Sequence, residues 1–368
     1  MSREVLEQQS ATTTSARSTY RGGCFSVCRI ASKTARSLLA KLLSNYLKRS
    51  SSLRRAITSM DIESYRDVDG VWMHNVFDEK ILRMGMRYKP RPGEILLVSF
   101  PKCGTTWTQH IVCNILTRAQ PPSEDGGFDL MTQFLDLTGG TSKEAAARNG
   151  PAVSHLPPVA LRPVAHAKYI YVARNPYDVA VSYYHFLKGL TPKTIDVSFE
   201  RYIRLFISGK LLYGDYLDHL LPWYQWRNDS NVLLITYEDL KANFKEQVLK
   251  IADFLGEEHG AALRKDDELL RKILDACSLE SIRSIVKGNG LERLKSVQQM
   301  AIGTTAQPAS APPEIPEMHE GAGFVRKGVV GDWKNHFTPQ LIKETKAWIA
   351  EKTKGSDVMS LWANCGLP

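Results

Sequence analysis

The sequence predicts an α/β fold: a single domain with a central parallel sheet flanked by helices. Short uncharged apolar runs at 95–98, 168–172 and 232–236 have the character of strands buried on both faces. Each run is followed directly by a segment whose apolar residues recur at helical spacing. Strands that alternate with helices in this way are typical of a parallel sheet covered on both sides. At 368 residues the chain is long enough to bury a sizeable core.

Pro and Gly punctuate the first half of the chain. Pro92-Gly93 and Pro101 bound the first strand, and the long stretch at 120–150 is rich in loop-forming residues. The elements expected up to the second strand are a helix around 75–88, the strand at 95–98, a helix from 107 through 116, a helix around 128–137, a Pro-rich connection at 153–163 and the strand at 168–172.

The second half is mostly helical. The segment 302–323, rich in Pro, Ala and Gly, is too long for a simple connector, so we expect a lid or a disordered loop there. The expected elements are helices at 176–186, 198–211 and 213–226, the strand at 232–236, and helices at 237–254, 266–276, 279–286 and 338–352.

Charge divides the chain near residue 60. The formal net charge is +9, and residues 1–60 carry 11 Lys and Arg against two Glu, so the whole excess lies there. The remainder is neutral, and a nucleic-acid hypothesis would have to rest on the first 60 residues alone. We therefore expect a basic extension over 1–60, disordered or targeting, a folded domain over 61–368, and no nucleic-acid partner.

The extension leaves three interpretations open. Residues 8–60 lack acidic side chains and are rich in Ser, Thr and Arg, as mitochondrial transit peptides are. Apolar residues at 38–47 could form a helix on a membrane surface, or the segment could be disordered upstream of a start at Met60. No run approaches the 18 apolar residues of a membrane span, and the six cysteines show no pairing or metal-ligand pattern. We expect a cytoplasmic protein, with mitochondria as the alternative if 1–60 is a transit peptide.

The loop after the first strand has the character of an anion site. Lys102 supplies a charge, Gly104 lets the backbone come close to a ligand, and Thr105 and Thr106 supply hydroxyls. The helix that follows would direct its unpaired N–H groups at the same point. The Lys precedes the Gly, unlike the Lys of the phosphate loop in nucleotide hydrolases.

Two further stretches carry cations in positions that suit a phosphate. In YVARNPYDVAVSYYHF at 171–186, Arg174 follows a strand directly, and Ser182 lies two turns into the helix that Pro176 opens. An Arg at the end of a buried strand suits bidentate binding of a phosphate. In FVRKGVVGDWKNHF at 324–337, Arg326 and Lys327 precede the flexible Gly328. Each stretch alone could also be a solvated basic turn.

Together these motifs resemble the cytosolic sulfotransferases, which transfer sulfonate from 3′-phosphoadenosine 5′-phosphosulfate (PAPS). The matching stretches are PKCGTTW at 101–107, YVARNPYDVAVSYYHF at 171–186, YEDL at 237–240 and RKGVVGDWKNHFT at 326–338. The resemblance runs from about residue 61 to the C-terminus. It implies sulfonate transfer to a hydroxyl or amine of a small-molecule acceptor, with 3′,5′-ADP as the leaving product and no metal. It also implies a phosphate-binding strand–loop–helix like that of nucleotide kinases.

The resemblance implies roles for individual residues. The loop would hold the 5′-phosphosulfate, and Lys102 would also neutralise charge on the leaving phosphate. Tyr237 matches a contact to the adenine, and ACSLES at 276–281 resembles another nucleotide-binding segment, in which Cys277 and Leu279 replace the usual Thr and Phe. The implied donor-binding residues are Lys102, Cys103, Gly104, Thr105, Thr106, Trp107, Arg174, Ser182, Tyr237, Ser278, Arg326, Lys327 and Gly328.

His155, in SHLP, matches the family's catalytic histidine. A general base with a pKa near the working pH would suit deprotonation of an acceptor hydroxyl. His110, His185 and His219 lie within expected helices and are interpreted as structural. Two residues before His155 the family usually has a Lys, where this chain has Val153, so Lys102 would carry more of the charge stabilisation.

Three points stay open at this stage. A nucleotide-binding relative without turnover and a small-molecule kinase are alternatives, although we see no Asp at a neighbouring strand end to hold the Mg²⁺ that a kinase needs. Phe134, Tyr183, Trp223 and the segment 302–323 could line an apolar acceptor pocket, or simply pack in the core. Lys334, Thr338-Pro339 and Lys343 stand where the family's dimer motif has Lys, Thr-Val and Glu, and these differences argue against that dimer.

Overall fold

The computed structural model describes residues 65–75, 77–120, 134–140, 150–189, 198–285 and 325–368. All of them lie in one compact unit, residues 53–368. The expected extension over 1–60, most of the helix expected around 128–137 and the segment 302–323 therefore lie outside the described residues. Among the helices that are described, none has the length and hydropathy to cross a bilayer.

A four-stranded parallel sheet forms the centre of this unit, as the sequence predicts. Its strands lie in the order β4 (Ala152–Ser154), β3 (Ile95–Ser99), β5 (Lys168–Ala173) and β6 (Val232–Thr236). Leu97 of β3 pairs with Val153 on one side and with Ile170 on the other. Because all four strands run the same way, their carboxyl ends meet at one edge, where parallel α/β sheets bind their ligands.

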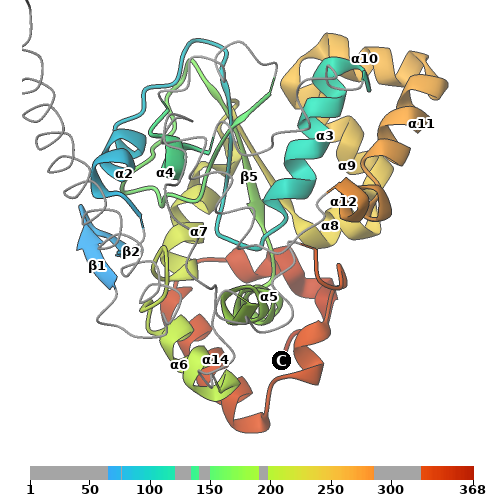
Figure 1. Cartoon of the computed structure of the whole chain (residues 1–368). Helices are drawn as coiled ribbons and strands as arrows, with labels where there is room; N and C mark the ends of the chain where they lie inside the picture. The colour runs from blue at the N-terminus through green and yellow to red at the C-terminus, as the bar shows by residue number, and fades with distance from the viewer. Residues whose placement is uncertain (1–64, 76, 121–133, 141–149, 190–197, 286–324) are drawn as a thin grey trace, which may run out of the picture. The chain divides into compact units, whose positions relative to one another are not determined.

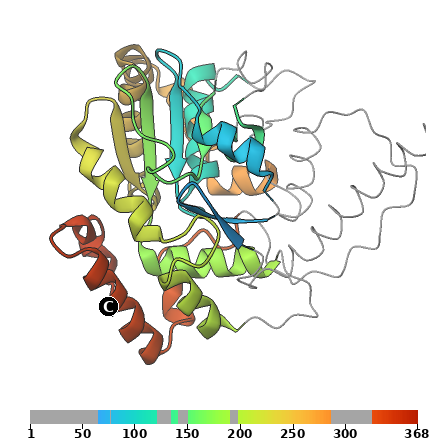
Figure 2. The ribbon, with the colours of Figure 1, turned by 90° about the vertical axis from the view of Figure 1, so that its left-hand side faces the viewer.

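Helices cover both faces of the sheet, and side chains of successive strand residues alternate between two cores. Figure 1 shows β5 between α7 on one side and α3 on the other, and Figure 2 shows the strands side by side. Leu97, Ile170 and Ile235 pack with helix residues such as Ile111 and Val248. That core contains α3 (Thr105–Thr117), α9 (Phe244–Leu255) and α11 (Asp267–Ala276). The opposite core contains α5 (Pro176–Gly189), α6 (Phe199–Ile207), α7 (Tyr216–Gln225) and α14 (Pro339–Lys352).

The structure differs from the prediction in several elements. The expected helix at 75–88 is shorter, because Asp78 caps α2 (Glu79–Met86) by accepting from the N–H groups of Lys80 and Ile81. An antiparallel hairpin precedes it, and β4 begins the expected connection at 153–163. The elements that the sequence did not predict are β1 (Tyr65–Val68), β2 (Val71–His74), β4, α10 (Glu257–Lys265), η3 (Trp226–Asn228), η4 (Asp332–Asn335) and η5 (Val358–Cys365).

The helix expected over 237–254 is two helices. The backbone of Asn243, with φ −132° and ψ 52°, leaves the helical region between α8 (Tyr237–Ala242) and α9. Of the helix expected at 128–137, the described part contains the single turn α4 (Leu135–Thr138). Leu279–Ile285 forms α12, close to the prediction.

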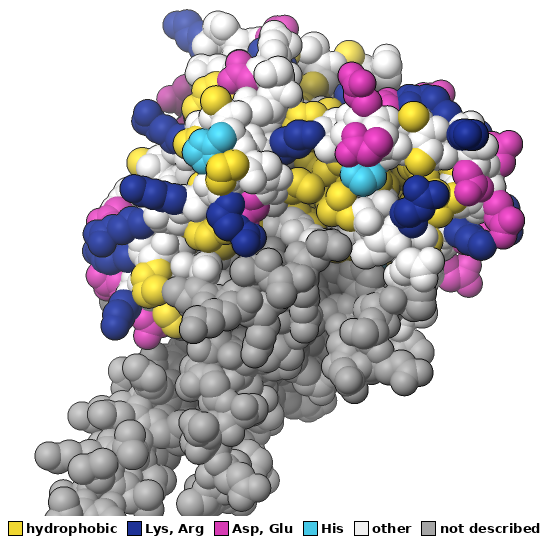
Figure 3. Space-filling model, turned by 90° about the horizontal axis from the view of Figure 1, so that it is seen from above, with side chains coloured by type: hydrophobic (Ala, Val, Ile, Leu, Met, Phe, Trp, Pro, Cys, Tyr) yellow, Lys and Arg dark blue, Asp and Glu magenta, His cyan; other side chains and the backbone are white. Residues whose placement is uncertain are grey.

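Charges on the described surface are mixed rather than segregated. On the face shown in Figure 3, Lys and Arg are interspersed with Asp and Glu. This distribution agrees with the neutral balance of the chain beyond residue 60.

Two buried carboxylates fasten distant segments beside the carboxyl end of β5. Glu238 accepts from Asn175 through its backbone N–H at 3.0 Å and its Nδ2 at 2.8 Å, and from Trp362 Nε1 at 2.9 Å. Asp178 accepts from the backbone N–H groups of Gly331 at 2.6 Å and Trp333 at 3.0 Å. The segment 331–333 and the C-terminal η5 are thereby tied to the first turn of α5.

Replacing Glu238 with Ala should therefore cost more stability than an ordinary surface change. Three donors would lose their acceptor, and each buried unsatisfied donor costs about 1–3 kcal/mol. We expect the free energy of unfolding, measured with urea, to fall by about 3 kcal/mol or more. Glu246→Ala, on the exposed face of α9, is the control and should change it by less than about 0.5 kcal/mol. Equal effects of the two substitutions would show that Glu238 does not hold this junction.

Candidate functional site

The predicted residues gather at the carboxyl edge of the sheet. The loop 101–104 follows β3, His155 follows β4, Arg174 follows β5 and Tyr237 follows β6. Residues that are far apart in the sequence thus meet because the strands that carry them are parallel neighbours.

The loop between β3 and α3 has an unusual backbone. Lys102 and Gly104 have positive φ angles of 71° and 110°. Gly104 caps α3 without any side-chain hydrogen bond, so the first N–H groups of the helix have no capping side chain. A Cβ at Gly104 would lie 3.0 Å from the ring of Tyr237, which adds a steric reason for glycine. Cys103 is fully buried and belongs to the core, while Thr105 bonds Ser99 Oγ at 2.6 Å.

Arg174 is the central cation of the site. Its side chain is buried, and its guanidinium lies 4.2 Å from the ring centroid of Tyr237. It donates to the carbonyl of Lys102 at 3.3 Å and to the carbonyl of Val329 at 3.0 Å. One side chain therefore links the loop after β3 with the segment near residue 329.

Two arginines act on Lys102 at this point. Burial, together with the positive charges of Arg174 and Arg326, lowers the pKa of Lys102 to about 7. Its Nζ lies 4.6 Å from the ring centroid of Phe186. Like charges crowded in a partly buried space favour binding of an anion, because an anion relieves their repulsion.

Asp332 organises the third predicted motif. Its buried carboxylate pairs with Arg326 and accepts from Lys327 Nζ at 2.8 Å. Burial alone would raise the pKa of Asp332, but the hydrogen bonds from Lys327 and Arg326 hold it well below its usual range. Gly328, at a φ of 69°, continues the turn.

Tyr237 and the segment 276–281, the predicted nucleotide contacts, both adjoin Trp107. Trp107 Nε1 donates to the carbonyl of Cys277 at 2.9 Å, and its ring meets that of Tyr237 edge-on at 5.6 Å. Ser278 Oγ accepts from Ser281 N–H at 3.1 Å at the start of α12. Arg283, which the sequence did not single out, donates to the carbonyl of Lys327 at 2.5 Å. Thr106 and Ser182 are partly exposed on α3 and α5.

His155 is held in a defined orientation. Its Nδ1 lies 2.6 Å from the carbonyl oxygen of Ser99, and because a carbonyl can only accept, we assign the proton to Nδ1. Nε2 then carries the lone pair. Burial, together with the charge of Lys102, lowers the pKa of His155 to about 4, although the bond to Ser99 opposes the shift. His155 is therefore a neutral imidazole at physiological pH, and its pKa is lower than the value near the working pH that the sequence led us to expect of a general base.

Asp136 is the functional residue that the sequence analysis missed. It is buried, and it accepts from the backbone N–H of His155 at 3.0 Å and from Ser154 Oγ at 2.6 Å. Burial raises the pKa of Asp136 to about 6, against the opposing effect of these bonds. A carboxylate inside the apolar run Phe134–Leu137 was the available signal, since a buried Asp needs partners.

The residues suggested for the acceptor pocket divide into two groups. Tyr183 and Trp223 are completely buried, and Tyr183 donates to the carbonyl of Leu212 at 3.0 Å, which favours the core-packing alternative. Phe134 lies edge-on to His155 with 5.1 Å between ring centroids, and Tyr213 does so at 5.5 Å. His110 and His219 are fully buried in α3 and α7, as a structural role requires.

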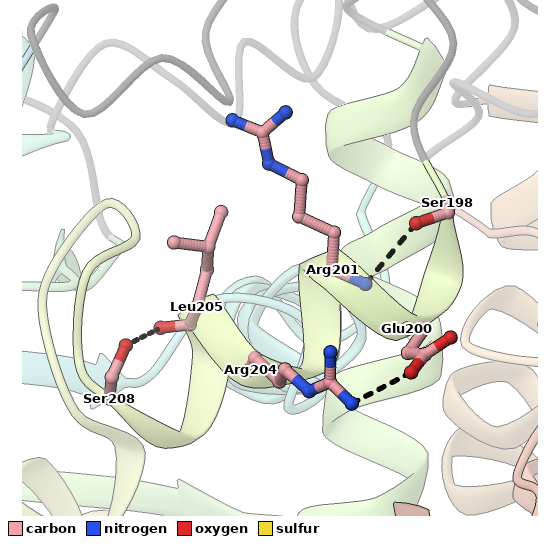
Figure 4. A pocket seen from close by; sticks show the side chains of 6 residues that line it. All are labelled: Ser198, Glu200, Arg201, Arg204, Leu205 and Ser208. Carbon is pink, nitrogen blue, oxygen red and sulfur yellow. Dashed lines mark hydrogen bonds and ion pairs between the residues drawn. The ribbon is translucent and has the colours of Figure 1, made fainter.

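A shallow pocket of about 380 Å³ lies elsewhere, along α6 (Figure 4). None of its residues belongs to the predicted site, and the Arg201 side chain extends away from the other labelled side chains. Arg204 is paired with Glu200 at 2.7 Å, so the pocket offers no arrangement comparable with the sheet edge. The residues that line this pocket are Ser198, Glu200, Arg201, Arg204, Leu205 and Ser208.

Among the described residues, no three His, Cys, Asp or Glu are grouped so that they could hold a metal ion.

Comparison with known proteins gives consistent results. The family model described as "Sulfotransferase domain" matches residues 92–357. Sulfotransferase 1E1 of Bos taurus is 30% identical over 298 residues, which cover 78% of this chain and 92% of that protein. Amine sulfotransferase of Oryctolagus cuniculus is 29% identical over 294 residues, covering 77% and 89%. The crystal structure of mouse sulfotransferase SULT7A1 complexed with PAP matches with a TM-score of 0.59 and 26% identity, covering 82% of this chain and 99% of that one.

The lowered pKa of Lys102 predicts a pH dependence of nucleotide binding. A bound phosphate would return the pKa of Lys102 toward its ordinary value, so binding above pH 7 should take up a proton, whereas at pH 6 Lys102 is already charged. We expect the affinity for PAP, the nucleotide in the mouse complex, to fall between pH 7 and pH 9. Calorimetry in buffers of different ionisation enthalpy should detect the uptake. Lys102→Gln should abolish it, and a buffer-independent heat in the unaltered protein would contradict the shift.

Proposed function

The chain belongs to the sulfotransferase family, and on this premise we propose roles for the residues at its sheet edge. It is a PAPS-dependent sulfotransferase, which transfers sulfonate from PAPS to a hydroxyl or amine group of a small-molecule acceptor. The observation that supports the proposed mechanism best is that His155, oriented by its bond to the carbonyl of Ser99, lies at the same sheet edge as the loop that carries Lys102.

The donor would be held by cations from three elements. The loop 102–107 and the N-terminus of α3 suit the 5′-phosphosulfate, and Arg174 and Ser182 with 326–328 suit the 3′-phosphate. Tyr237 and Ser278 suit the adenine. The lowered pKa of Lys102 beside Arg174 and Arg326 supports an anionic ligand at this point, because Asp332, the carboxylate of the third motif, is already engaged with Arg326 and Lys327.

In the proposed reaction, the acceptor oxygen attacks sulfur while the bond from sulfur to the phosphate oxygen breaks. The leaving electron pair stays on the 5′-phosphate, and Lys102 stabilises the charge that develops there. The acceptor proton passes to Nε2 of His155, which the bond from Nδ1 to Ser99 leaves as the acceptor nitrogen. One bond to sulfur forms and one breaks, so the step needs no further reactant.

The valine at position 153 is a reason to assign most of the charge stabilisation to Lys102. Its side chain is buried in the core beside Leu97 and Phe134, so this position supplies no cation where the family usually has one. Phe134 and Tyr213, edge-on to His155, favour a planar acceptor near the base. The relatives include an enzyme named as an amine sulfotransferase, and we include amines with hydroxyls for that reason.

The remaining proposals concern the whole chain. We keep 1–60 as a basic extension and 61–368 as the sulfotransferase domain, with a cytoplasmic location and no nucleic-acid partner. Pro339 is the first residue of α14 and Lys343 lies one turn later, so we propose that the chain does not dimerise through the family's C-terminal motif. A measurement of sulfonate transfer from PAPS would distinguish an active enzyme from a binding relative that has lost activity.

Arg174→Ala should weaken PAPS binding far more than it lowers the rate at saturation, because the 3′-phosphate is remote from sulfur. Losing a buried charge partner costs about 2–5 kcal/mol, or roughly thirtyfold or more in affinity. Adenosine 5′-phosphosulfate, which lacks the 3′-phosphate, should bind the variant and the unaltered protein much more equally. The control is Arg271→Ala, on the exposed surface of α11, which should bind both donors normally. If the variant loses the same factor with both donors, Arg174 does not contact the 3′-phosphate.

His155→Gln tests the proposed base directly. Nucleotide affinity should change little, while turnover falls by about a hundredfold to ten-thousandfold, the usual size of a general-base effect. The loss should be smaller for nitrophenols than for steroid alcohols, because an acidic hydroxyl needs less help in losing its proton. His259→Gln, on α10, serves as the control. A uniform, few-fold slowing of all acceptors would instead make His155 a packing or acceptor-positioning residue.

A further inference from the structure

A second, fully buried histidine contacts the backbone of His155. His219, on α7, places its Nε2 3.1 Å from the backbone carbonyl oxygen of His155. Its Nδ1 lies 2.9 Å from the hydroxyl of Tyr171, on β5, whose ring is also fully buried. None of the three motifs of the donor site contains His219, and its place within a helix gave no reason to connect it with the reaction.

The chemistry of the partners fixes which atom donates in each hydrogen bond of His219. The carbonyl of His155 can only accept, so Nε2 of His219 carries a proton and donates it. Burial lowers the pKa of His219 to about 3, and the ring is therefore neutral. In a neutral imidazole the other nitrogen accepts, so the Tyr171 hydroxyl is the donor to Nδ1. The carbonyl of His155 thus sets the tautomer of His219, and the Tyr171 hydroxyl completes it by donating to Nδ1.

The surroundings leave His219 little freedom. The Tyr171 ring stacks on Trp223 with 5.2 Å between centroids and 14° between planes, and Phe100 meets His219 edge-on at 5.8 Å. His155 is consequently fixed at three points: its N–H by Asp136, its ring by Ser99 and its carbonyl by His219.

We infer that Tyr171 and His219 form a relay that positions His155 for proton abstraction. This inference rests on the proposed role of His155 as the base. Tyr171 and His219 are positioning residues: they touch neither acceptor nor donor and act through the peptide that carries the base. A displacement of the base of the order of 1 Å can cost about a hundredfold in rate, so a carbonyl anchor of this kind has a measurable effect.

The test removes one hydroxyl. Tyr171→Phe keeps the ring but removes the donor to Nδ1 of His219, which leaves the ring that holds the carbonyl of His155 less firmly fixed. We expect turnover to fall by about tenfold to a hundredfold, less than in His155→Gln, with PAP affinity unchanged and a larger loss for weakly acidic acceptors. The control is Tyr183→Phe, an equally buried tyrosine whose hydroxyl donates to the carbonyl of Leu212. It should lose stability to a similar degree without the dependence on acceptor acidity.

A double-mutant cycle separates positioning from folding. In a His155→Gln background, Tyr171→Phe should cost little further turnover, because the base it positions is gone. A full additional loss would overturn the inference, as would equal kinetics of Tyr171→Phe and Tyr183→Phe. If His155→Gln itself were nearly silent, the proposed base would fail, and that outcome is distinct from a failure of the relay alone.

A second pair of variants covers the case in which Tyr171→Phe does not fold. His219→Gln retains a side-chain N–H that can reach the carbonyl of His155, whereas His219→Leu does not. The glutamine variant should keep turnover within about tenfold of the unaltered enzyme, and the leucine variant should show the steeper dependence on acceptor acidity. Indistinguishable kinetics in two folded variants would contradict the relay.

Discussion

The repulsion that Arg174 and Arg326 exert on Lys102 is the constraint on which this site depends. The three cations belong to segments that are more than 70 residues apart in pairs, and they are brought together at one edge of a parallel sheet. Like charges repel, so these side chains do not favour the grouping themselves, and burial strengthens the repulsion. The fold must therefore hold them in place by other contacts, and the carboxylates around them supply these. Asp332 pairs with Arg326, while Asp178 and Glu238 bind backbone and side-chain N–H groups behind Arg174.

On the β4 side of the site, other contacts are again needed, here to orient His155 rather than to offset repulsion between charges. His155 has a short strand before it and the sequence Leu156-Pro157-Pro158 after it, with no helix to fix its backbone. The protein fixes each of its polar groups separately, with Asp136, Ser99 and His219. Both halves of the site thus rely on buried polar groups. The backbone N–H, Nδ1 and carbonyl of His155 each have a partner, whereas Nε of Arg174 and Nε of Arg326 have none among the described residues.

Much of the fold was predictable from the sequence, for a physical reason. The strands at 95–98, 168–172 and 232–236 are buried on both faces, so their apolar runs are unmistakable, and the Lys, Arg and Gly residues at their ends have few purely structural uses. The three-residue β4 was missed because it is too short to show a pattern. Asp136 and His219 were missed as partners of His155 because their contacts join residues 19 and 64 positions apart, and no local periodicity reports such a contact. The break at Asn243 depends on a backbone conformation that propensity does not specify.

The segment 326–331 is contacted largely through its backbone. Arg174 binds the carbonyl of Val329, Arg283 binds the carbonyl of Lys327, and Asp178 accepts from the N–H of Gly331. The side chains of Val329 and Val330 are exposed, at 43% and 37%. Evolution can therefore change these two residues freely while the path of the chain is preserved. Among related sequences, the shape of this turn should persist longer than the identity of its middle residues, and the glycines at 328 and 331, with positive φ angles, should mark its ends.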